Sequence, residues 1–410
     1  MKQRVIVLGA GMVGTCSAIH LALRGHEVLL VDRGDPGRET SYGNAGLIQR
    51  EAVEPYPFPR EWTRVARAAA RLGVDVNYHF DALPAIARPL ARYWLNSAPA
   101  AHARASAAYE RLIAHCLTEH QFLMDRIAAD DLVRRDGYLW VFRHESTFQE
   151  ARARARRLAE DSGVRHVVLE TEAVRALQPM LQTRLPAIHW LDPWAVNDPG
   201  ELVARYAALF RQSGGHIVTG DALTLAESST GWQVRTAEGV VDAPHAVVAL
   251  GPWSDALLRR LGYRWPLFVK RGYHRHYRMD PAPPLAMLDA DSGFVLAPMR
   301  TGVRLTTGAE FARIDAPATP VQLRRAEVLA RGLLPLGEPV EATPWLGARP
   351  CTADMLPVIG AAPRHPGLWL NFGHAHQGFT LGPVSGRLIA ELVDGSPTLV
   401  PLDAYAPTRF

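Results

Sequence analysis

The first 32 residues alternate between short apolar blocks and an amphipathic stretch, the pattern of a strand, a helix and a second strand. Residues 5–8 form a β-branched apolar run that is too short for a helix and predicts a buried parallel strand. Apolar residues then recur at helical spacing from Met12 to Leu23, and residues 28–31 form a second apolar run after Gly25. We therefore predict a strand–helix–strand unit at the start of an α/β sheet.

Similar patterns recur along the rest of the chain. Asp198-Pro199-Gly200-Glu201 has the residues of a helix start, with Asp198 as the N-cap and Pro199 in the first turn. Residues 295–305 predict a hairpin that turns at 300–302. Further strands are expected at 137–142, 215–219, 232–235, 246–250, 267–279 and 368–372, and helices at 148–160, 320–334 and 383–393. The order of these elements predicts an α/β fold, α+β overall.

Composition indicates a globular chain of two or three domains. The chain has 410 residues, of which 48% are apolar, 45 are basic and 41 are acidic, so we expect neither disorder nor a nucleic-acid-binding surface. Cys16, Cys116 and Cys351 are widely spaced, which argues against a disulfide framework and a metal site. This cysteine usage fits a reducing cytoplasm, so we expect a cytoplasmic protein. No apolar run approaches the ~20 residues of a membrane span, so we expect any membrane contact to be peripheral.

The strongest motif, Gly9-Ala10-Gly11-Met12-Val13-Gly14, joins the first strand to the first helix, and Asp32 ends the second strand. Here Gly9 permits a tight turn, Gly11 lets the backbone approach a pyrophosphate, and Gly14 lets the helix pack on the strand. The helix N-terminus attracts phosphates, and Asp32 can accept hydrogen bonds from ribose hydroxyls. The unit predicts a dinucleotide site, with an unliganded crossover as the alternative. Asp32 argues against NADP and leaves FAD and NAD open.

Two later predicted strands also end in turns at the edge of the sheet where a nucleotide-binding sheet usually binds its ligand. Residues 246–250 run into Gly251-Pro252-Trp253-Ser254, and residues 368–372 run into Gly373-His374-Ala375-His376. The loop at 39–48 is small and polar, as a loop around a cofactor would be, although polarity alone indicates only a loop.

These pieces together resemble the FAD-dependent D-amino acid oxidase superfamily, and most closely its bacterial D-amino acid dehydrogenase branch. The matching stretches are GAGMVG with Asp32, TSYGNAGLI, VVALGPWS, KRGY, GARPCTADMLPVIG and NFGHAHQGFTLGPVSG. The resemblance implies a Rossmann-like FAD-binding domain made of discontinuous segments, with an inserted mixed-sheet substrate domain. It places the FAD-binding domain in residues 1–60, 195–265 and 340–410 and the substrate-binding domain in residues 61–194 and 266–339.

The resemblance also assigns residues to FAD. The glycines of the first motif would face the pyrophosphate and Asp32 the ribose, and the helix expected from Pro383 would point at the flavin. Some amine-oxidising relatives attach their flavin through a cysteine at the position that is Gly347 here, so we expect non-covalent FAD. The full expected set is Gly9, Ala10, Gly11, Met12, Val13, Gly14, Asp32, Arg33, Thr40, Ser41, Asn44, Ala45, Gly46, Leu47, Ala222, Ala249, Gly251, Trp253, Gly373, His374, Gly378, Phe379 and Thr380.

A smaller set is expected at the substrate. Arg349 matches the family arginine that binds the substrate carboxylate, a role that suits its planar guanidinium; a surface ion pair is the alternative. His376 and Tyr273 are the further catalytic candidates, and for His376 a general base and a hydrogen-bonding role both stay open. Tyr42, His274 and His376 are expected to contact the substrate, whereas His374 is expected to shape the pocket.

The function that the resemblance implies is oxidation of a D-amino acid by hydride transfer from its Cα to flavin N5. The Gly-His-x-His-x-Gly stretch resembles enzymes acting on D-proline or cis-4-hydroxy-D-proline. A sarcosine, secondary-amine or glycine oxidase and a flavin-binding electron-transfer subunit of a larger dehydrogenase are the alternatives. The electron acceptor is expected to be a quinone, the respiratory chain or O2, and partner subunits stay open.

Overall fold

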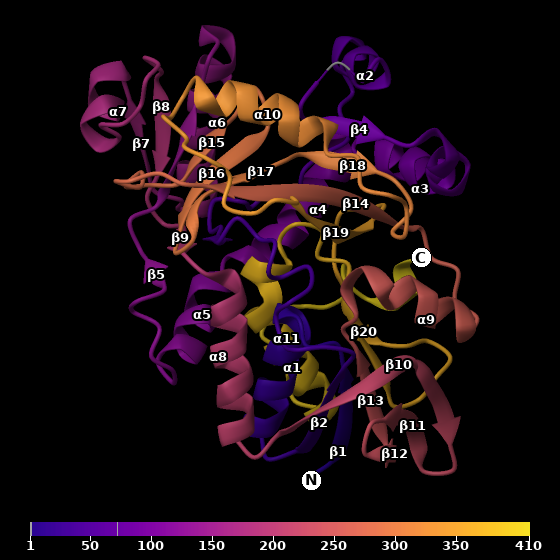
Figure 1. Cartoon of the computed structure of the whole chain (residues 1–410). Helices are drawn as coiled ribbons and strands as arrows, with labels where there is room; N and C mark the ends of the chain where they lie inside the picture. Colours follow the sequence, from indigo (N-terminus) through magenta and orange to yellow (C-terminus); the bar gives the residue numbers. More distant parts are fainter. Residues whose placement is uncertain (1, 72) are drawn as a thin grey trace.

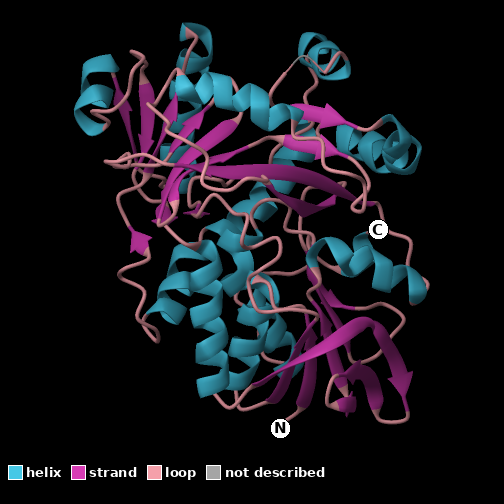
Figure 2. Ribbon diagram, viewed as in Figure 1, coloured by secondary structure: helices cyan, strands magenta, loops and turns pink. Residues whose placement is uncertain are grey.

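Two large β-sheets organise the molecule, a computed structural model that describes residues 2–71 and 73–410, except for the side chain of residue 64. Figure 1 shows one sheet at the bottom, beside the N-terminus and helix α1, and the other sheet across the top. Figure 2 shows helices beside the lower sheet and above the upper one. We call the lower one the first sheet and the upper one the second sheet.

Eight strands of the described chain form the first sheet, in the order β12-β11-β10-β2-β1-β13-β21-β20. Its central strands β10, β2, β1, β13 and β21 are parallel, so the turns that follow them meet at one edge. The strands are β1 (Arg4–Leu8), β2 (Glu27–Asp32), β10 (His216–Ser228), β11 (Gly231–Thr236), β12 (Gly239–Ala243), β13 (His245–Val248), β20 (Val358–Ala361) and β21 (Leu368–Phe372).

The second sheet is mixed, and within the described ranges it contains ten strands in the order β4-β18-β14-β17-β16-β15-β6-β8-β7, with β19 paired to β14. Its strands are β4 (Val76–Tyr78), β6 (Tyr138–Val141), β7 (His166–Leu169), β8 (Ala187–Trp190), β14 (Leu267–Tyr277), β15 (Met287–Asp289), β16 (Phe294–Met299), β17 (Gly302–Thr306), β18 (Ala309–Phe311) and β19 (Trp345–Thr352). A small sheet joins β3 (Leu47–Ile48), β9 (Trp194–Val196) and β5 (Val133–Arg134).

Helix α1 (Met12–Leu23) packs closely against α11 (Gly378–Asp394) beside the first sheet (Figure 1). The approach depends on two glycines of α11, because a Cβ at Gly382 would lie 2.5 Å from Met12 and one at Gly386 2.6 Å from the Cys16 backbone. The other helices are α2 (Trp62–Ala69), α3 (Leu83–Asn96), α4 (Pro99–Ile113), α5 (Cys116–Met124), α6 (Glu145–Ser162), α7 (Thr171–Leu177), α8 (Pro199–Gln212), α9 (Ser254–Arg260) and α10 (Val321–Arg331).

Most of the predicted elements are confirmed, including the N-cap of α8, where the Asp198 carboxylate accepts a hydrogen bond from the Glu201 amide at 3.0 Å. The predicted start of the last helix at Pro383 is wrong, because α11 begins at Gly378 and contains Pro383. A proline inside a helix leaves the carbonyl four residues earlier without its usual donor. A tertiary hydrogen bond to that carbonyl, described below, lets the helix begin earlier.

Three elements make contacts across the predicted domain boundaries, which stay a prediction. Strand β19 falls in the expected FAD-binding segment 340–410 but pairs with β14 of the second sheet. Helices α4 and α5 fall in the expected substrate-binding segment 61–194 but pack against α11 beside the first sheet. These contacts are long-range in sequence, so the local pattern of residues could not reveal them.

Two further properties bear on the sequence expectations. The cysteines Cys16, Cys116 and Cys351 are buried and free. In residues 2–71 and 73–410, no helix combines the length and the apolar character that crossing a bilayer requires.

Candidate active site

A cavity of about 910 Å³ connects the glycine turns of the first sheet to the face of the second sheet. Gly9, Asp32 and Trp253 line one part of it, and Arg349 and Phe311 line another. Its wall combines residues from the beginning, middle and end of the chain. The parallel topology explains this, since the carboxyl ends of neighbouring strands converge at one edge.

The turn after β1 has the geometry of a phosphate cradle. Gly9 has a φ of +102°, and a Cβ there would lie 2.5 Å from the Ala249 carbonyl oxygen. A Cβ at Gly14 would lie 1.8 Å from the Gly9 carbonyl oxygen, so only glycine lets α1 approach the turn. Gly11 caps α1 without a side chain, and the first turn of α1 contains no acidic residue. The start of this helix therefore suits an anionic ligand.

Asp32 lies at the end of β2 and is already fixed by the backbone. Its Oδ2 accepts a hydrogen bond from the Ala10 amide at 2.6 Å, and its Oδ1 accepts one from the Gly34 amide at 3.1 Å. Beside it, the Arg33 guanidinium lies 4.2 Å from the Trp253 ring centre and pairs with Glu39. These residues line the cavity together with Ala222, Ala249 and Gly251. The arrangement fits the nucleoside end of a dinucleotide.

The loop after β2 is held in shape by its own side chains and by Arg304. Asn44 Oδ1 accepts hydrogen bonds from the amides of Gly46 and Leu47, at 2.8 and 3.3 Å. Arg304 donates to the Tyr42 carbonyl at 2.9 Å and to the Asn44 carbonyl. Burial lowers the pKa of Arg304 to about 10, so it remains charged at neutral pH. Thr40, Ser41, Asn44, Ala45 and Leu47 of this loop line the cavity.

The turn after β21 contributes a second group of predicted residues: Gly373, His374, His376, Gly378 and Phe379 line the cavity. Burial lowers the pKa of His374 to about 3, so its ring is neutral. Its buried Nε2 has no hydrogen-bond partner among the described residues. An unpaired polar atom in the cavity wall suits a polar cofactor. Four predicted cofactor residues, Ala10, Gly14, Gly46 and Thr380, lie behind the wall rather than in it.

Arg349 crosses the face of β14 and is held by the second sheet. Its Nη1 donates to the Gly308 carbonyl at 2.9 Å and its Nη2 to the Thr307 carbonyl at 3.2 Å. A Cβ at Gly272 would lie 2.5 Å from Nη2, so this glycine makes room for the guanidinium. In the described chain Arg349 has no acidic partner. Guanidinium has five N–H donors, and the unused ones can bind a carboxylate.

His376 shares this part of the cavity. Its ring lies edge-on to Tyr56, with the ring centres 4.7 Å apart. Burial, followed by the charges of Arg349 and Lys270, lowers the pKa of His376 to about 3. Its Nε2 lacks a hydrogen-bond partner among the described residues. His376 is therefore a neutral imidazole, which is better suited to hydrogen bonding than to accepting a proton.

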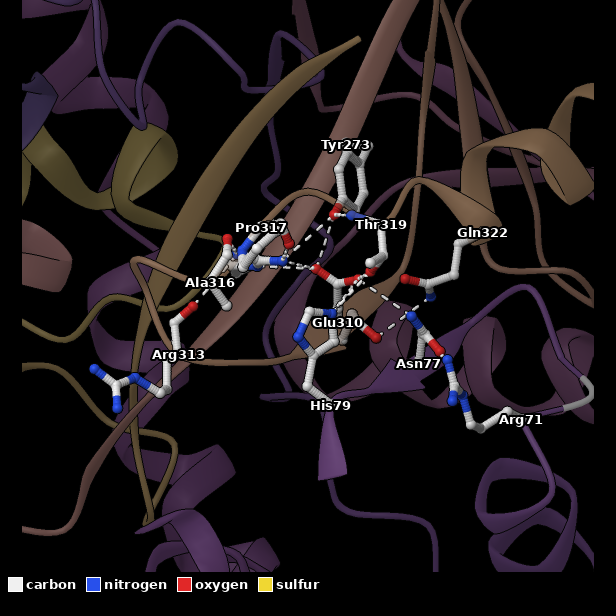
Figure 3. A network of polar contacts seen from close by, with 12 residues as sticks. Arg71, Asn77, His79, Tyr273, Glu310, Arg313, Ala316, Pro317, Thr319 and Gln322 are labelled. Carbon is white, nitrogen blue, oxygen red and sulfur yellow. Dashed lines mark hydrogen bonds and ion pairs between the residues drawn. The ribbon is translucent and has the colours of Figure 1, made fainter. Parts of the chain in front are cut away.

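Tyr273 lies in the cavity wall, but its hydroxyl belongs to a buried network (Figure 3). The hydroxyl donates to Glu310 Oε2 at 2.9 Å and accepts from the Thr319 amide at 2.7 Å. Arg271, which is 1% exposed, pairs with the fully buried Glu310 in the same network. Both hydrogen bonds of the Tyr273 hydroxyl thus go to other residues of the protein, and this geometry does not support a catalytic role for the hydroxyl.

Two predicted substrate contacts are placed elsewhere. His274 stacks on Trp345 with ring centres 4.8 Å apart, and Tyr42 lies 6.1 Å from the same ring. Trp345 lines the cavity, whereas Tyr42 and His274 lie behind it. Their contact with the substrate therefore stays a prediction, which this placement behind Trp345 does not support. Side chains on alternate faces of a strand separate in this way, and the sequence alone did not indicate which face of β14 meets the cavity.

The sequence analysis missed several residues in the cavity wall. Tyr56, Tyr93 and Tyr138 come from loops and elements between the recognised motifs, and their spacing gave no periodic signal. Lys270 occurs in the quoted KRGY stretch but was not predicted to be a site residue. Its rarity was the available signal, since the chain contains one other lysine, Lys2.

Comparison with known proteins identifies related chains over the full length. The family model described as FAD dependent oxidoreductase (DAO) matches residues 4–392. A D-amino acid dehydrogenase of Paramagnetospirillum magneticum is 31% identical over 424 residues, covering 100% of this chain and 99% of the relative. A D-amino-acid oxidase of Bradyrhizobium diazoefficiens is 30% identical, with the same coverage.

A solved structure shows the same fold. Glycine oxidase from Geobacillus kaustophilus aligns over 100% of both chains with a TM-score of 0.75 and 22% sequence identity. The resemblance inferred from the motifs and the mixed α/β architecture are both confirmed by these matches.

Proposed function

Because this chain belongs to the FAD-dependent oxidoreductases of the DAO family, we propose that it oxidises a D-amino acid at the carbon that bears the amine. The chain is an oxidoreductase acting on amino donors, and the D configuration is our inference from the named relatives. The substrate would become an imino acid, which water converts to a 2-oxo acid and ammonia.

One observation carries this proposal: an unpaired arginine shares a cavity with a phosphate cradle. Arg349 and the turn formed by Gly9 and Gly11 line the same space of about 910 Å³. Arg349 is half-buried, and a partly desolvated guanidinium without an acidic partner is stabilised when a ligand supplies the negative charge. A substrate carboxylate provides this charge, and its binding would orient the Cα–H bond within the cavity.

The residues around Arg349 would bind the substrate, orient it and limit the access of water. Arg349 would bind the carboxylate, and the neutral His376 would hydrogen-bond the amine or the cofactor. Phe58 and Phe311 supply an apolar wall that would limit the access of water to the reacting atoms, whereas Tyr56 is 51% exposed. When bound, FAD supplies the hydride acceptor. With no ionised side chain required as a base, orientation of a neutral amine by these residues is the main contribution.

We propose that FAD is bound without a covalent link. Within the described residues, none of the three cysteines lines the cavity. At position 347 a Cβ would lie 1.9 Å from the Trp345 ring, so a cysteine could not replace Gly347 without rearrangement. Cys351 is buried, and burial raises the pKa of its thiol, which disfavours the nucleophilic thiolate.

D-proline and cis-4-hydroxy-D-proline are our candidate substrates. The support is the Gly373-His374-Ala375-His376-Gln377-Gly378 stretch together with an aromatic and apolar wall around Arg349. A cyclic secondary amine would give a cyclic imine as its product. This assignment is narrower than the oxidation of D-amino acids and can fail separately from it.

Anaerobic bleaching of the bound flavin tests the proposal. The purified FAD-loaded protein would be mixed with a panel of D-amino acids, L-amino acids, glycine, sarcosine, and the proline and hydroxyproline stereoisomers. Bleaching by D-amino acids alone supports the proposal, whereas bleaching by sarcosine or glycine alone would establish a different oxidase. If no amino acid reduces the flavin in the isolated chain, that result favours the alternative that the chain is an electron-transfer subunit.

Two further measurements address the acceptor and the membrane. Peroxide formation in air, compared with quinone reduction, identifies the electron acceptor. Sedimentation with lipid vesicles tests peripheral membrane binding.

A further inference from the structure

Lys270 lies in the cavity wall, and its ammonium forms no ion pair with any acidic residue that the structure describes. Its ammonium donates a hydrogen bond to the Tyr93 hydroxyl at 3.1 Å and lies 4.4 Å from the centre of that ring. The rings of Phe268 and Phe311 lie 5.7 and 6.0 Å away. An ammonium group has three N–H donors, and in residues 2–71 and 73–410 the other two have no acceptor.

Tyr93 holds this ammonium rather than competing for a ligand. Its hydroxyl proton is donated to the Tyr56 carbonyl at 2.6 Å, which leaves the oxygen free to accept from Lys270. Tyr93 is 4% exposed and sits in α3, so a fixed helix sets the position of the lysine head group. The two unused N–H donors of Lys270 are therefore available at a defined place in the cavity.

Lys270 is directly opposite Arg349 in the pairing of β14 with β19. Residues opposite one another in an antiparallel pair share a face of the sheet, and like charges in this position are destabilising. The positive charges of Arg349 and Lys270 further lower the pKa of His376, which burial already lowers. Among the described acidic residues near this part of the cavity, Asp75 is exposed and Glu51 bonds Tyr138 and Gln49, so neither pairs with Lys270 or Arg349.

Resting on the proposed function, we propose that Lys270 binds an oxygen acceptor on the side chain of the substrate while Arg349 binds the α-carboxylate. The acceptor is an oxygen atom of a hydroxyl group or of a second carboxylate. Either group would accept the two free N–H donors of Lys270 and offset the repulsion between the paired cations. A substrate with an oxygen-bearing side chain would then be preferred over its counterpart that lacks the oxygen.

Two matched substrate pairs test this subsite. The first is cis-4-hydroxy-D-proline with D-proline, and the second is D-glutamate with D-norvaline. We expect the FAD-loaded wild-type protein to show at least about 10-fold higher kcat/KM for the oxygen-bearing member of one pair, the effect of one hydrogen bond to a charged donor. The pair that shows the preference identifies the source of the oxygen.

The Lys270→Met variant should bring this ratio close to one, because kcat/KM for the oxygen-bearing member of the pair falls by at least about 10-fold more than kcat/KM for its counterpart. Lys2→Met is the matched control, because it removes the chain's other lysine from an exposed position. If Lys270→Met does not fold, Lys270→Gln replaces it, and FAD content measures folding in each variant. Tyr93→Phe removes the acceptor that holds the ammonium and should lower the ratio part of the way.

A ratio near one for both pairs in the wild type would overturn the proposal, as would a ratio that survives in Lys270→Met. If D-proline or D-norvaline still reduces the flavin in the same experiments, the proposed oxidation of D-amino acids is supported although the Lys270 subsite is not. A protein whose flavin no D-amino acid reduces would overturn both inferences together.

Discussion

His120 donates a hydrogen bond from Nε2 to the carbonyl oxygen of Phe379, across a distance of 3.0 Å. This carbonyl is the one that Pro383, four residues later in α11, cannot bond because proline has no amide hydrogen. Burial lowers the pKa of His120 to about 4, so the ring is neutral, and its Nδ1 accepts from the Tyr206 hydroxyl at 3.2 Å. His120 thus completes the first turns of the helix whose start lines the cavity.

His120→Ala should therefore destabilise the protein by about 1–3 kcal/mol, because a buried carbonyl loses its donor. In a Pro383→Ala background the residue at 383 regains an amide hydrogen, so the same substitution should cost less. A double-mutant cycle in urea unfolding measures this coupling. Equal costs in both backgrounds would contradict the account. His189→Ala removes a histidine–carbonyl bond at an exposed site and serves as the control.

Gly14→Ala should abolish FAD binding or folding, because the new Cβ would lie 1.8 Å from the Gly9 carbonyl oxygen. Gly34→Ala is a matched control two residues after Asp32, where a Cβ meets no atom within 4 Å. The flavin absorbance of the purified proteins distinguishes them. We expect a yellow Gly34→Ala protein and a colourless or insoluble Gly14→Ala protein. Normal flavin content in Gly14→Ala would show that α1 can move away from the turn.

Arg349→Ala should raise KM by about 100-fold or more while FAD stays bound, because the carboxylate loses a charged, two-pronged partner. Arg349→Lys keeps the charge but loses the planar fork, so we expect an intermediate KM. Steady-state kinetics with the best substrate of the panel measures both variants. Unchanged kinetics in Arg349→Ala would exclude the assigned role.

Glu51 is 1% exposed and couples stability to pH. Its Oε1 accepts hydrogen bonds from the Tyr138 hydroxyl at 2.6 Å and from Gln49 Nε2 at 2.9 Å, while Oε2 has no partner among the described residues. Burial raises the pKa of Glu51 from 4.5 to about 6 despite these bonds. At a given pH, Glu51 is therefore more often protonated in the folded protein than in the unfolded chain.

A raised folded-state pKa contributes stability below the unfolded pKa, and this stability is lost as pH rises through the folded pKa. The window for Glu51 lies between about pH 4.5 and pH 6, and the effect is about 2 kcal/mol. Glu51→Gln cannot ionise, so its unfolding free energy relative to wild type should rise by this amount from pH 4.5 to pH 7. Glu238→Gln, at an exposed position, is the control. A flat difference for Glu51→Gln would contradict the prediction.

Local patterns were sufficient for the nucleotide-binding unit and the helix cap. The turn from Gly9 to Gly14, the acid at Asp32 and the N-cap at Asp198 depend on neighbours within about one turn or one strand, so their residue types predict their geometry. The convergence of the later turns was also predictable, because the carboxyl ends of parallel strands share an edge.

The surroundings of Arg349 depended on the tertiary structure. The pairing of β19 with β14 puts Lys270 opposite Arg349, and a shift of one residue would turn these side chains to the other face. The same pairing leaves His274 behind Trp345, and the partner that lets α11 begin before Pro383 comes from α5. The sequence by itself determined the strand–turn–helix unit at Gly9 to Gly14 and predicted Arg349 as the carboxylate partner. Only the tertiary structure decided which side chains surround that arginine, because strand register and helix contacts between distant segments have no local signal.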